Sequence, residues 1–99
     1  MDYVALSPSA AASDLSRLVV GFLDSQCGLA PNSYSYQTAL FSSGLLDSFA
    51  MLALISFLEH EVGVILLTEE VTQSNVDSID SLISWTMRAI QAKHDLPLL

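Results

Sequence analysis

Residues 44–63 read GLLDSFAMLALISFLEHEVG, and this stretch decides the fold. Asp47 and Ser48 are residue types that often begin a helix, and Gly63 suits the left-handed position just after one. Between them, apolar residues recur at helical spacing. The positions expected to face a core are Met51, Leu54, Ile55, Leu58 and Val62. We therefore predict a helix at residues 48–62.

A helix of similar length is expected between Ser7 and Gly28. Its apolar stripe has the spacing i, i+3, i+4, i+7 and i+8 and consists of Leu15, Leu18, Val19, Phe22 and Leu23. Either Ser7 followed by Pro8, or Ser13, can cap its start, and Gly28 suits the position after its end.

The last helix is expected to begin at Ile79, with Asp77 or Ser78 as its cap. Its apolar stripe consists of Ile79, Leu82, Ile83, Met87 and Ile90. Pro97 prevents its continuation. The basic residues near its end agree with the direction of the helix dipole.

The remaining segments predict connections. Residues 30–47 are rich in Pro, Asn, Ser, Tyr and Gly and indicate a long ordered loop. A short helix is expected at residues 73–76, and the apolar run at residues 64–67 is compatible with an extended segment. The pattern as a whole predicts an all-α fold, a bundle of three main helices plus one short helix.

Composition favours one folded domain. The 99 residues are 52% hydrophobic, and a chain of this size forms a single core. We assign residues 8–94 to this domain, and residues 1–7 and 95–99 to N-terminal and C-terminal tails. No signal peptide is indicated, and the longest apolar run, at residues 49–58, is too short to span a membrane. These features predict a cytoplasmic protein.

Charge and side-chain chemistry exclude several function classes. Eleven acidic and three basic residues give a net charge of -8, which argues against nucleic acid and favours a protein partner with a basic patch. Cys27 is the only cysteine, and no Cys/His spacing indicates a metal site. His60 and His94 are expected to lie on the surface.

The segment around Ser48 carries a resemblance to a known family. Residues 40–49, LFSSGLLDSF, followed by an apolar helix ending in FLEHEVGV, are similar to the acyl carrier proteins and peptidyl (aminoacyl) carrier proteins. Residues 74–79, SNVDSI, resemble the short third helix and the start of the fourth helix of that family. The similarity covers residues 15–90 and is closest to free-standing carriers of secondary metabolite biosynthesis.

The resemblance implies a function for Ser48. In the family, the serine of the Asp-Ser pair is the attachment point of 4'-phosphopantetheine, which makes the protein a phosphoprotein that holds an acyl or aminoacyl group as a thioester. Asp47 would support the site, by capping the helix or by approaching the magnesium ion of the phosphopantetheinyl transferase. The implied partners are that transferase, a loading ligase, and the synthase or tailoring enzymes of nonribosomal peptide or polyketide biosynthesis. No intrinsic catalysis is implied.

A partner-binding face is expected on the solvent side of the helix at residues 48–62. Advancing 100° per residue from Ser48 places on this side Phe49, Leu52, Ala53, Ser56, Glu59 and His60. The family often has acidic residues where Ala50 and Ala53 stand here, so apolar contacts through Phe49 and Leu52 are expected to dominate docking.

The sequence leaves two other functions open. A hydrolase-like triad would need a histidine beside Ser48, but His60 lies twelve residues along the same helix, about 18 Å away. An unmodified helical interaction module would explain the composition and the helices, but it leaves the Asp47-Ser48 entry unexplained.

Overall fold

The computed structural model describes residues 8–94 of the chain. Its elements are helix α1 (Pro8–Cys27), a 3-10 turn η1 (Pro31–Ser33), α2 (Ser48–Val62), α3 (Gln73–Val76) and α4 (Ile79–His94). No strand occurs within these residues. The predicted all-α bundle of three long helices and one short helix is confirmed. The two tails predicted at residues 1–7 and 95–99 lie outside the described part of the chain.

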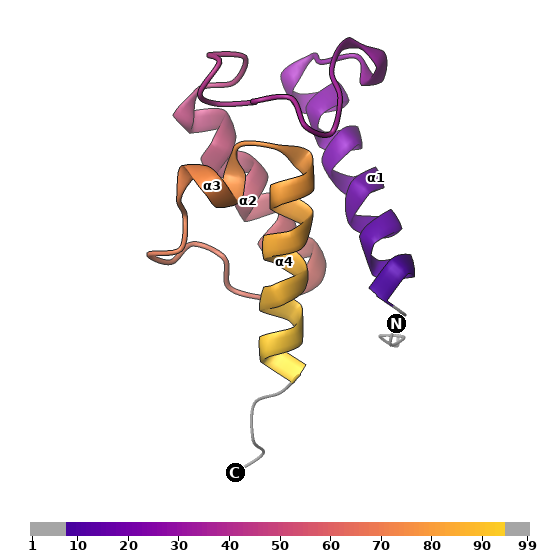
Figure 1. Ribbon diagram of the computed structural model, residues 1–99, viewed down its shortest axis with the longest axis vertical. Helices are drawn as coiled ribbons and strands as arrows, with labels where there is room; N and C mark the ends of the chain where they lie inside the picture. Colours follow the sequence, from indigo (N-terminus) through magenta and orange to yellow (C-terminus); the bar gives the residue numbers. More distant parts are fainter. Residues whose placement is uncertain (1–7, 95–99) are drawn as a thin grey trace.

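The three long helices pack around one core (Figure 1). Helix α1 contacts both α2 and α4, and the short α3 packs against α4. A long loop crosses from the end of α1 to the start of α2. No helix in residues 8–94 combines the length and the apolar character needed to cross a membrane.

The core takes most of its buried residues from the predicted apolar stripes. Five residues of the α1 and α4 stripes are only half-buried and pack against its edge, namely Leu18, Phe22, Ile83, Met87 and Ile90. Leu15, Val19 and Leu23 of α1 are buried, as are Leu54, Ile55 and Leu58 of α2. Helix α4 and its neighbours contribute a third set of buried residues, which comprises Val76, Ile79, Leu82, Trp85 and Thr86. Met51 and Val62, also predicted to face the core, are half-buried and pack against its edge. A second contact between α1 and α2 joins the rings of Phe22 and Phe57, whose centroids are 5.1 Å apart.

Most helix ends follow the chemistry expected from the sequence. Ser13, one of the two candidate caps of α1, instead lies inside that helix, and the other, Ser7, lies outside the described residues. Gly28 and Gly63 both adopt a positive φ of 71°, the left-handed conformation that residues with a Cβ rarely adopt. The backbone N–H of Gly63 donates to the carbonyl of Glu59 at 2.9 Å, which satisfies one of the last carbonyls of α2. Both glycines therefore end their helices as predicted.

The cap of α4 is Ser78. Its hydroxyl oxygen accepts a hydrogen bond from the backbone N–H of Ser81 at 3.1 Å, while its carbonyl accepts from the N–H of Leu82 at 2.9 Å. Asp77, the other candidate cap, is turned toward the loop between α1 and α2. Of the two predicted caps, the structure therefore selects Ser78 and gives Asp77 a different role.

Residues 64–67 form no strand, but they alternate in burial as an extended segment does. Val64 and Leu66 are buried, whereas Ile65 and Leu67 are exposed. The backbone N–H groups of Leu66 and Leu67 both donate to the Glu59 carboxylate, at 2.7 and 2.8 Å. A side chain of α2 thus replaces the neighbouring strand that would normally accept these hydrogen bonds.

Candidate functional site

Ser48 lies at the first position of α2 and is exposed to solvent. Asp47 precedes it in an extended conformation and caps the helix, because its Oδ1 accepts a hydrogen bond from the backbone N–H of Ala50 at 2.8 Å. Within residues 8–94 the Ser48 hydroxyl makes no hydrogen bond. The serine oxygen is therefore held at a rigid helix start and is open to a partner from outside.

The helix start also creates a favourable site for an anion. Unpaired backbone N–H groups and the helix dipole give the amino end of α2 a partial positive charge. Asp47 satisfies one of these N–H groups. An anionic group at this position would lie beside the remaining ones, where a negative charge is stabilised.

The loop before Ser48 is fixed by buried leucines and by hydrogen bonds. Leu40 and Leu46 are buried, and the backbone N–H of Leu46 donates to the carbonyl of Leu40 at 2.8 Å. Gly44, with a φ of 83°, makes the tight turn between them, and its N–H donates to the carbonyl of Phe41 at 3.0 Å. The loop therefore delivers Asp47 and Ser48 to α2 in one defined geometry.

Asp77 anchors this loop to the other side of the molecule. Its carboxylate accepts hydrogen bonds from the backbone N–H of Phe41 at 2.8 Å and of Ser42 at 2.9 Å, and from the Ser42 hydroxyl at 2.6 Å. Its own carbonyl accepts from the N–H of Leu40 at 2.7 Å. The hydrogen bonds from Ser42, chiefly that of its hydroxyl, lower the pKa of the Asp77 carboxyl below its usual value, because they favour the charged form.

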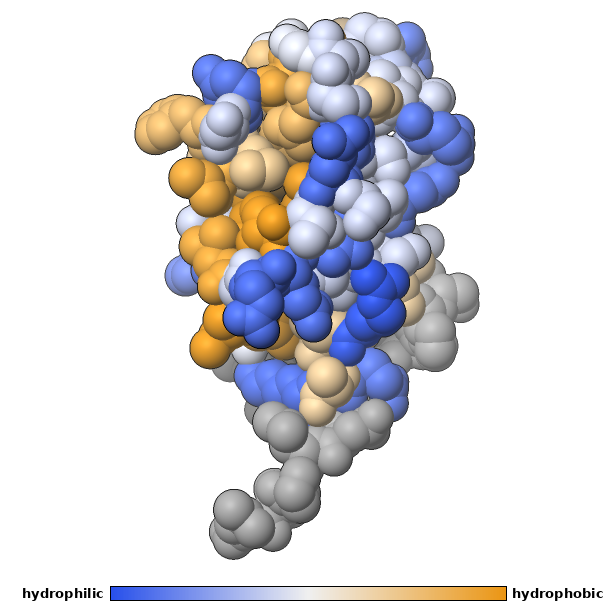
Figure 2. Space-filling view, turned by 60° about the vertical axis from the view of Figure 1, so that its left-hand side comes forward, coloured by the Kyte–Doolittle hydropathy of each residue, from blue (hydrophilic) through white to orange (hydrophobic). Residues whose placement is uncertain are grey.

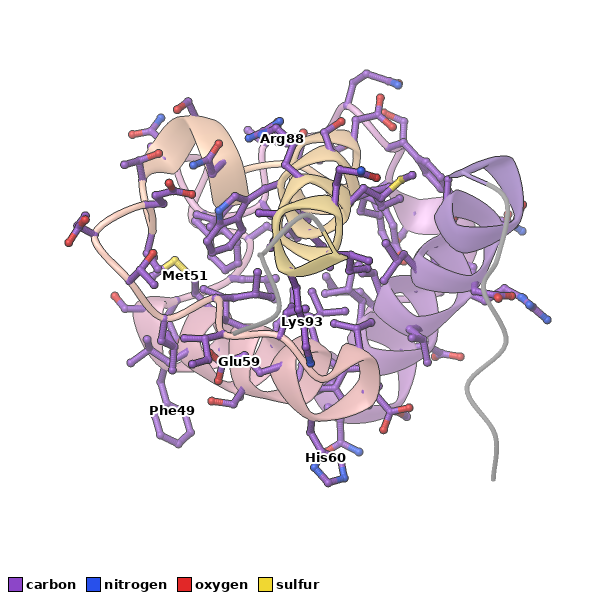
Figure 3. All side chains as sticks on the ribbon, turned by 90° about the horizontal axis from the view of Figure 1, so that it is seen from below. Phe49, Met51, Glu59, His60, Arg88 and Lys93 are labelled. Atoms are coloured by element: carbon purple, nitrogen blue, oxygen red, sulfur yellow. The ribbon has the colours of Figure 1, made fainter. Side chains whose placement is uncertain are left out.

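The outer face of α2 exposes the predicted apolar residues. Phe49 is 81% exposed and Leu52 is 47% exposed, and Ser56 and His60 also face solvent. Ala53 is half-buried. In Figure 3, Phe49 and His60 point away from the bundle at opposite ends of the helix. We refer to Phe49 and Leu52 as the helix patch.

Glu59 has a role that sequence reasoning missed. It was expected on the partner-binding face, but its half-buried carboxylate accepts the two backbone hydrogen bonds from Leu66 and Leu67. In the sequence, Glu59 stands one turn before Gly63. If the chain reverses at Gly63, the backbone N–H groups that follow it can reach the Glu59 carboxylate. Glu59 therefore holds the loop after α2 in place.

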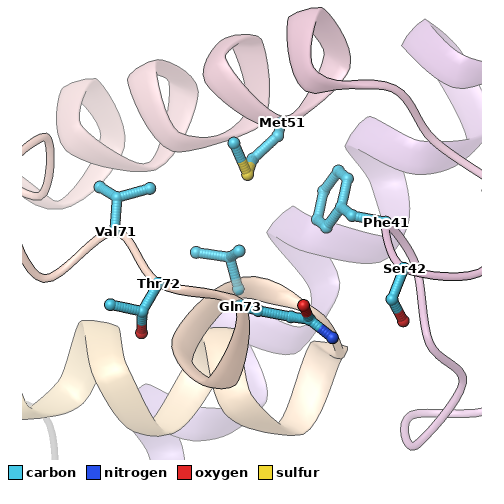
Figure 4. A pocket seen from close by; sticks show the side chains of 7 residues that line it. Phe41, Ser42, Met51, Val71, Thr72 and Gln73 are labelled. Carbon is cyan, nitrogen blue, oxygen red and sulfur yellow. The ribbon is translucent and has the colours of Figure 1, made fainter.

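A groove lies between α2, α3 and the loop that precedes α2 (Figure 4). It has a volume of about 300 Å³, and its lining residues are Phe41, Ser42, Met51, Val71, Thr72, Gln73 and Val76. Met51 is three residues after Ser48, so the groove opens within one helical turn of the serine. Phe41, Met51 and Val71 give one side of it an apolar surface.

The other chemically active side chains do not join Ser48 in a catalytic arrangement. His60 lies near the far end of α2 from Ser48, and the side chain of His94 lies outside the described residues. Burial, together with the negative charge of Asp47, raises the pKa of the Cys27 thiol, which disfavours a reactive thiolate. Within residues 8–94 no group of His, Cys, Asp and Glu side chains is placed to hold a metal ion.

Comparison with known proteins identifies no relative. No protein-family model, no curated protein and no solved structure matches the chain.

Proposed function

We propose that this protein is a carrier that holds an acyl or aminoacyl group as a thioester on a 4'-phosphopantetheine arm attached to Ser48. The observation that carries the proposal is the exposed, unbonded hydroxyl of Ser48 at the capped start of α2. The anchored loop before it fixes the serine from one side, and the helix fixes it from the other. Attachment there leaves the core undisturbed.

The proposal explains features that lie apart in the chain. The amino end of α2 favours the phosphate of the arm, and Asp47 keeps that end ordered. The groove beside Met51 offers an apolar cargo a surface within one turn of Ser48. The helix patch, close to Ser48 on α2, offers enzymes an apolar surface to bind. A phosphopantetheinyl transferase, a loading ligase and a downstream synthase or tailoring enzyme are the proposed partners, in the cytoplasm.

In this function the chain has no catalytic role of its own. A nucleophilic serine needs a general base within hydrogen-bond distance, and the described residues place none beside Ser48. The cargo reacts on the enzymes that bind the carrier. The function proposed is therefore the holding and presenting of a substrate.

Intact mass spectrometry tests the proposal directly. The protein is incubated with a broad-specificity phosphopantetheinyl transferase, coenzyme A and Mg²⁺, alongside an authentic carrier protein as a positive control. We expect the mass to increase by one phosphopantetheine group. Ser48→Ala should gain nothing, and Ser56→Ala, which changes another exposed serine of α2, should be modified normally. A wild-type chain that stays unmodified while the control is loaded would overturn the proposal.

The same measurement decides the second candidate, an unmodified helical interaction module. The exposed apolar side chains of Phe49 and Leu52 favour it, because a monomer gains nothing from exposing them. A carrier also needs such a face for its enzymes. Only the carrier gains mass, so modification at Ser48 separates the two functions.

A further inference from the structure

The loop after α2 exposes two large apolar side chains that the proposed attachment site does not need. Ile65 is 78% exposed and Leu67 is 43% exposed, while Val64 and Leu66, which alternate with them, are buried. We refer to Ile65 and Leu67 as the loop patch. Neither residue lies at the start of α2 or lines the groove beside Met51.

Ile65 and Leu67 lie in a segment, residues 63–67, whose backbone is held at both ends. At its start, the Lys93 ammonium group donates a hydrogen bond to the carbonyl of Gly63 at 2.5 Å. At its end, the Glu59 carboxylate accepts from the N–H groups of Leu66 and Leu67. The buried side chains of Val64 and Leu66 add apolar anchors between these points. Ile65 and Leu67 are therefore presented outward by a fixed backbone.

The loop patch lies on the same side of α2 as the helix patch. Leu52 and Glu59 are seven residues apart, so they share one side of the helix at a separation of about 10 Å along its axis. Glu59 in turn holds the backbone of Leu67. Figure 2 shows that hydrophobic side chains gather in a band along one side of the molecule, with hydrophilic side chains beside them. The contact between Glu59 and Leu67 therefore places the loop patch beside the far end of α2, on the side that bears Leu52.

The charges around this surface indicate what it binds. The residues of both patches have exposed carboxylates close to them in sequence, at Asp47, Glu61 and Glu69. Each of the cations Arg17, Arg88 and Lys93 has a partner within the molecule, namely Asp14, the side-chain oxygen of Asn75 and the carbonyl of Gly63, respectively. The net charge of the protein, -8, opposes pairing with a second copy of the chain and adsorption to an anionic lipid surface. An apolar surface bordered by Lys and Arg is the complementary partner.

We propose that the loop patch and the helix patch together form one docking surface for a partner protein that presents an apolar contact area bordered by basic side chains. The loop patch extends this surface from the start of α2 toward its far end. The surface does not require modification of Ser48, and its test stands apart from the test of the carrier function.

A synthetic amphipathic helical peptide, with leucines on one face and lysines at its borders, serves as the probe. It is titrated into the full-length ¹⁵N-labelled protein, and backbone amide shifts are recorded. We expect shifts concentrated at residues 49–52 and 64–68. The double variant Ile65→Ser and Leu67→Ser should bind about tenfold more weakly, since it removes two exposed apolar side chains that the peptide would bury. A peptide with glutamates in place of the lysines should bind more weakly than the lysine peptide.

Matched controls make the result decisive. Leu45→Ser removes a leucine whose exposed fraction, 42%, is nearly that of Leu67, and it should keep wild-type affinity. Retained amide dispersion shows that each variant is folded. Unchanged affinity of the double variant, or equal loss in Leu45→Ser, would overturn the proposal. So would a dimer in sedimentation, or binding to phosphatidylcholine vesicles, that depends on Ile65 and Leu67, because the occupant would then be a second copy or a lipid surface.

Discussion

Asp77 accepts hydrogen bonds from both the backbone N–H and the hydroxyl of Ser42, although 35 residues separate them in the chain. The contact ties the loop that leads to Ser48 to the residue just before the cap of α4. It favours the charged carboxylate and lowers the pKa of Asp77 in the folded protein. The loop that leads to Ser48 is therefore held by a carboxylate from another part of the bundle.

Stability should fall in acid partly because of Asp77. The folded protein binds the proton of this carboxyl less readily than the unfolded chain does. Its contribution is therefore complete above the unfolded pKa, which is about 4, and is lost as the pH falls through the lower folded pKa. Asp77→Asn should lower the free energy of unfolding by about 1 kcal/mol at neutral pH and by less in acid. Urea unfolding at both pH values measures this, with Glu61→Gln as the control. A loss independent of pH would contradict the charge argument.

Asp47 should show separable effects on folding and on loading. Asp47→Ala removes the acceptor for the N–H of Ala50 and should cost about 1 kcal/mol of stability. Asp47→Asn should keep most of that stability, since asparagine caps helices as well as aspartate does. We expect Asp47→Asn nevertheless to be loaded more slowly by the transferase, because the carboxylate is lost. Thermal unfolding and the initial rate of mass gain are compared. If Asp47→Asn and the wild type are loaded at the same rate, the role of Asp47 is limited to capping the helix.

Docking of the loading ligase should depend on Leu52 more than on salt. Leu52→Glu places a charge in the helix patch and should reduce loading sharply while helical circular dichroism is retained. Ser56→Glu adds the same charge one turn further along and should have a smaller effect. Raised salt should slow wild-type loading only modestly, since salt screens exposed charges but not apolar burial. A strong salt effect with a silent Leu52→Glu would place recognition on the carboxylates instead.

Glu59 should control the loop after α2. Glu59→Ala leaves the N–H groups of Leu66 and Leu67 without their acceptor, and we expect a loss of stability of about 1 to 3 kcal/mol. Hydrogen exchange at these two amides should become faster, while exchange in the middle of α2 changes less. Glu61→Ala, an exposed position on the same helix, is the control. Unchanged protection of both amides would show that the buried side chains alone hold the loop.

The helices were predictable because their signals are local. Apolar spacing within one segment, a cap such as Asp47 and a glycine such as Gly63 act over a few residues, and each of these predictions is confirmed. The exposure of Phe49 and Leu52 follows from the same periodicity. The attachment role of Ser48 stays a prediction, because it depends on chemistry with another protein.

The contacts of Asp77 and Glu59 were not predictable in the same way. Both carboxylates accept backbone hydrogen bonds from segments that only the tertiary fold brings to them. Periodicity places Glu59 on the outer side of α2, but it carries no information on how the chain turns after Gly63. The alternate burial of residues 64–67 likewise depends on α2 lying beneath them.

Trp85 is the only tryptophan of the chain, and it is buried in α4 with its indole N–H donating to a carboxylate oxygen of Glu70 at 3.3 Å. Glu70 lies in the connection that leads to α3, so the single indole joins two parts of the molecule. The fluorescence of Trp85 therefore reports on the contact between α4 and the connection that leads to α3. Detachment of that connection would shift the emission to the red before the helical content changes, which gives the protein an intrinsic optical reporter without any label.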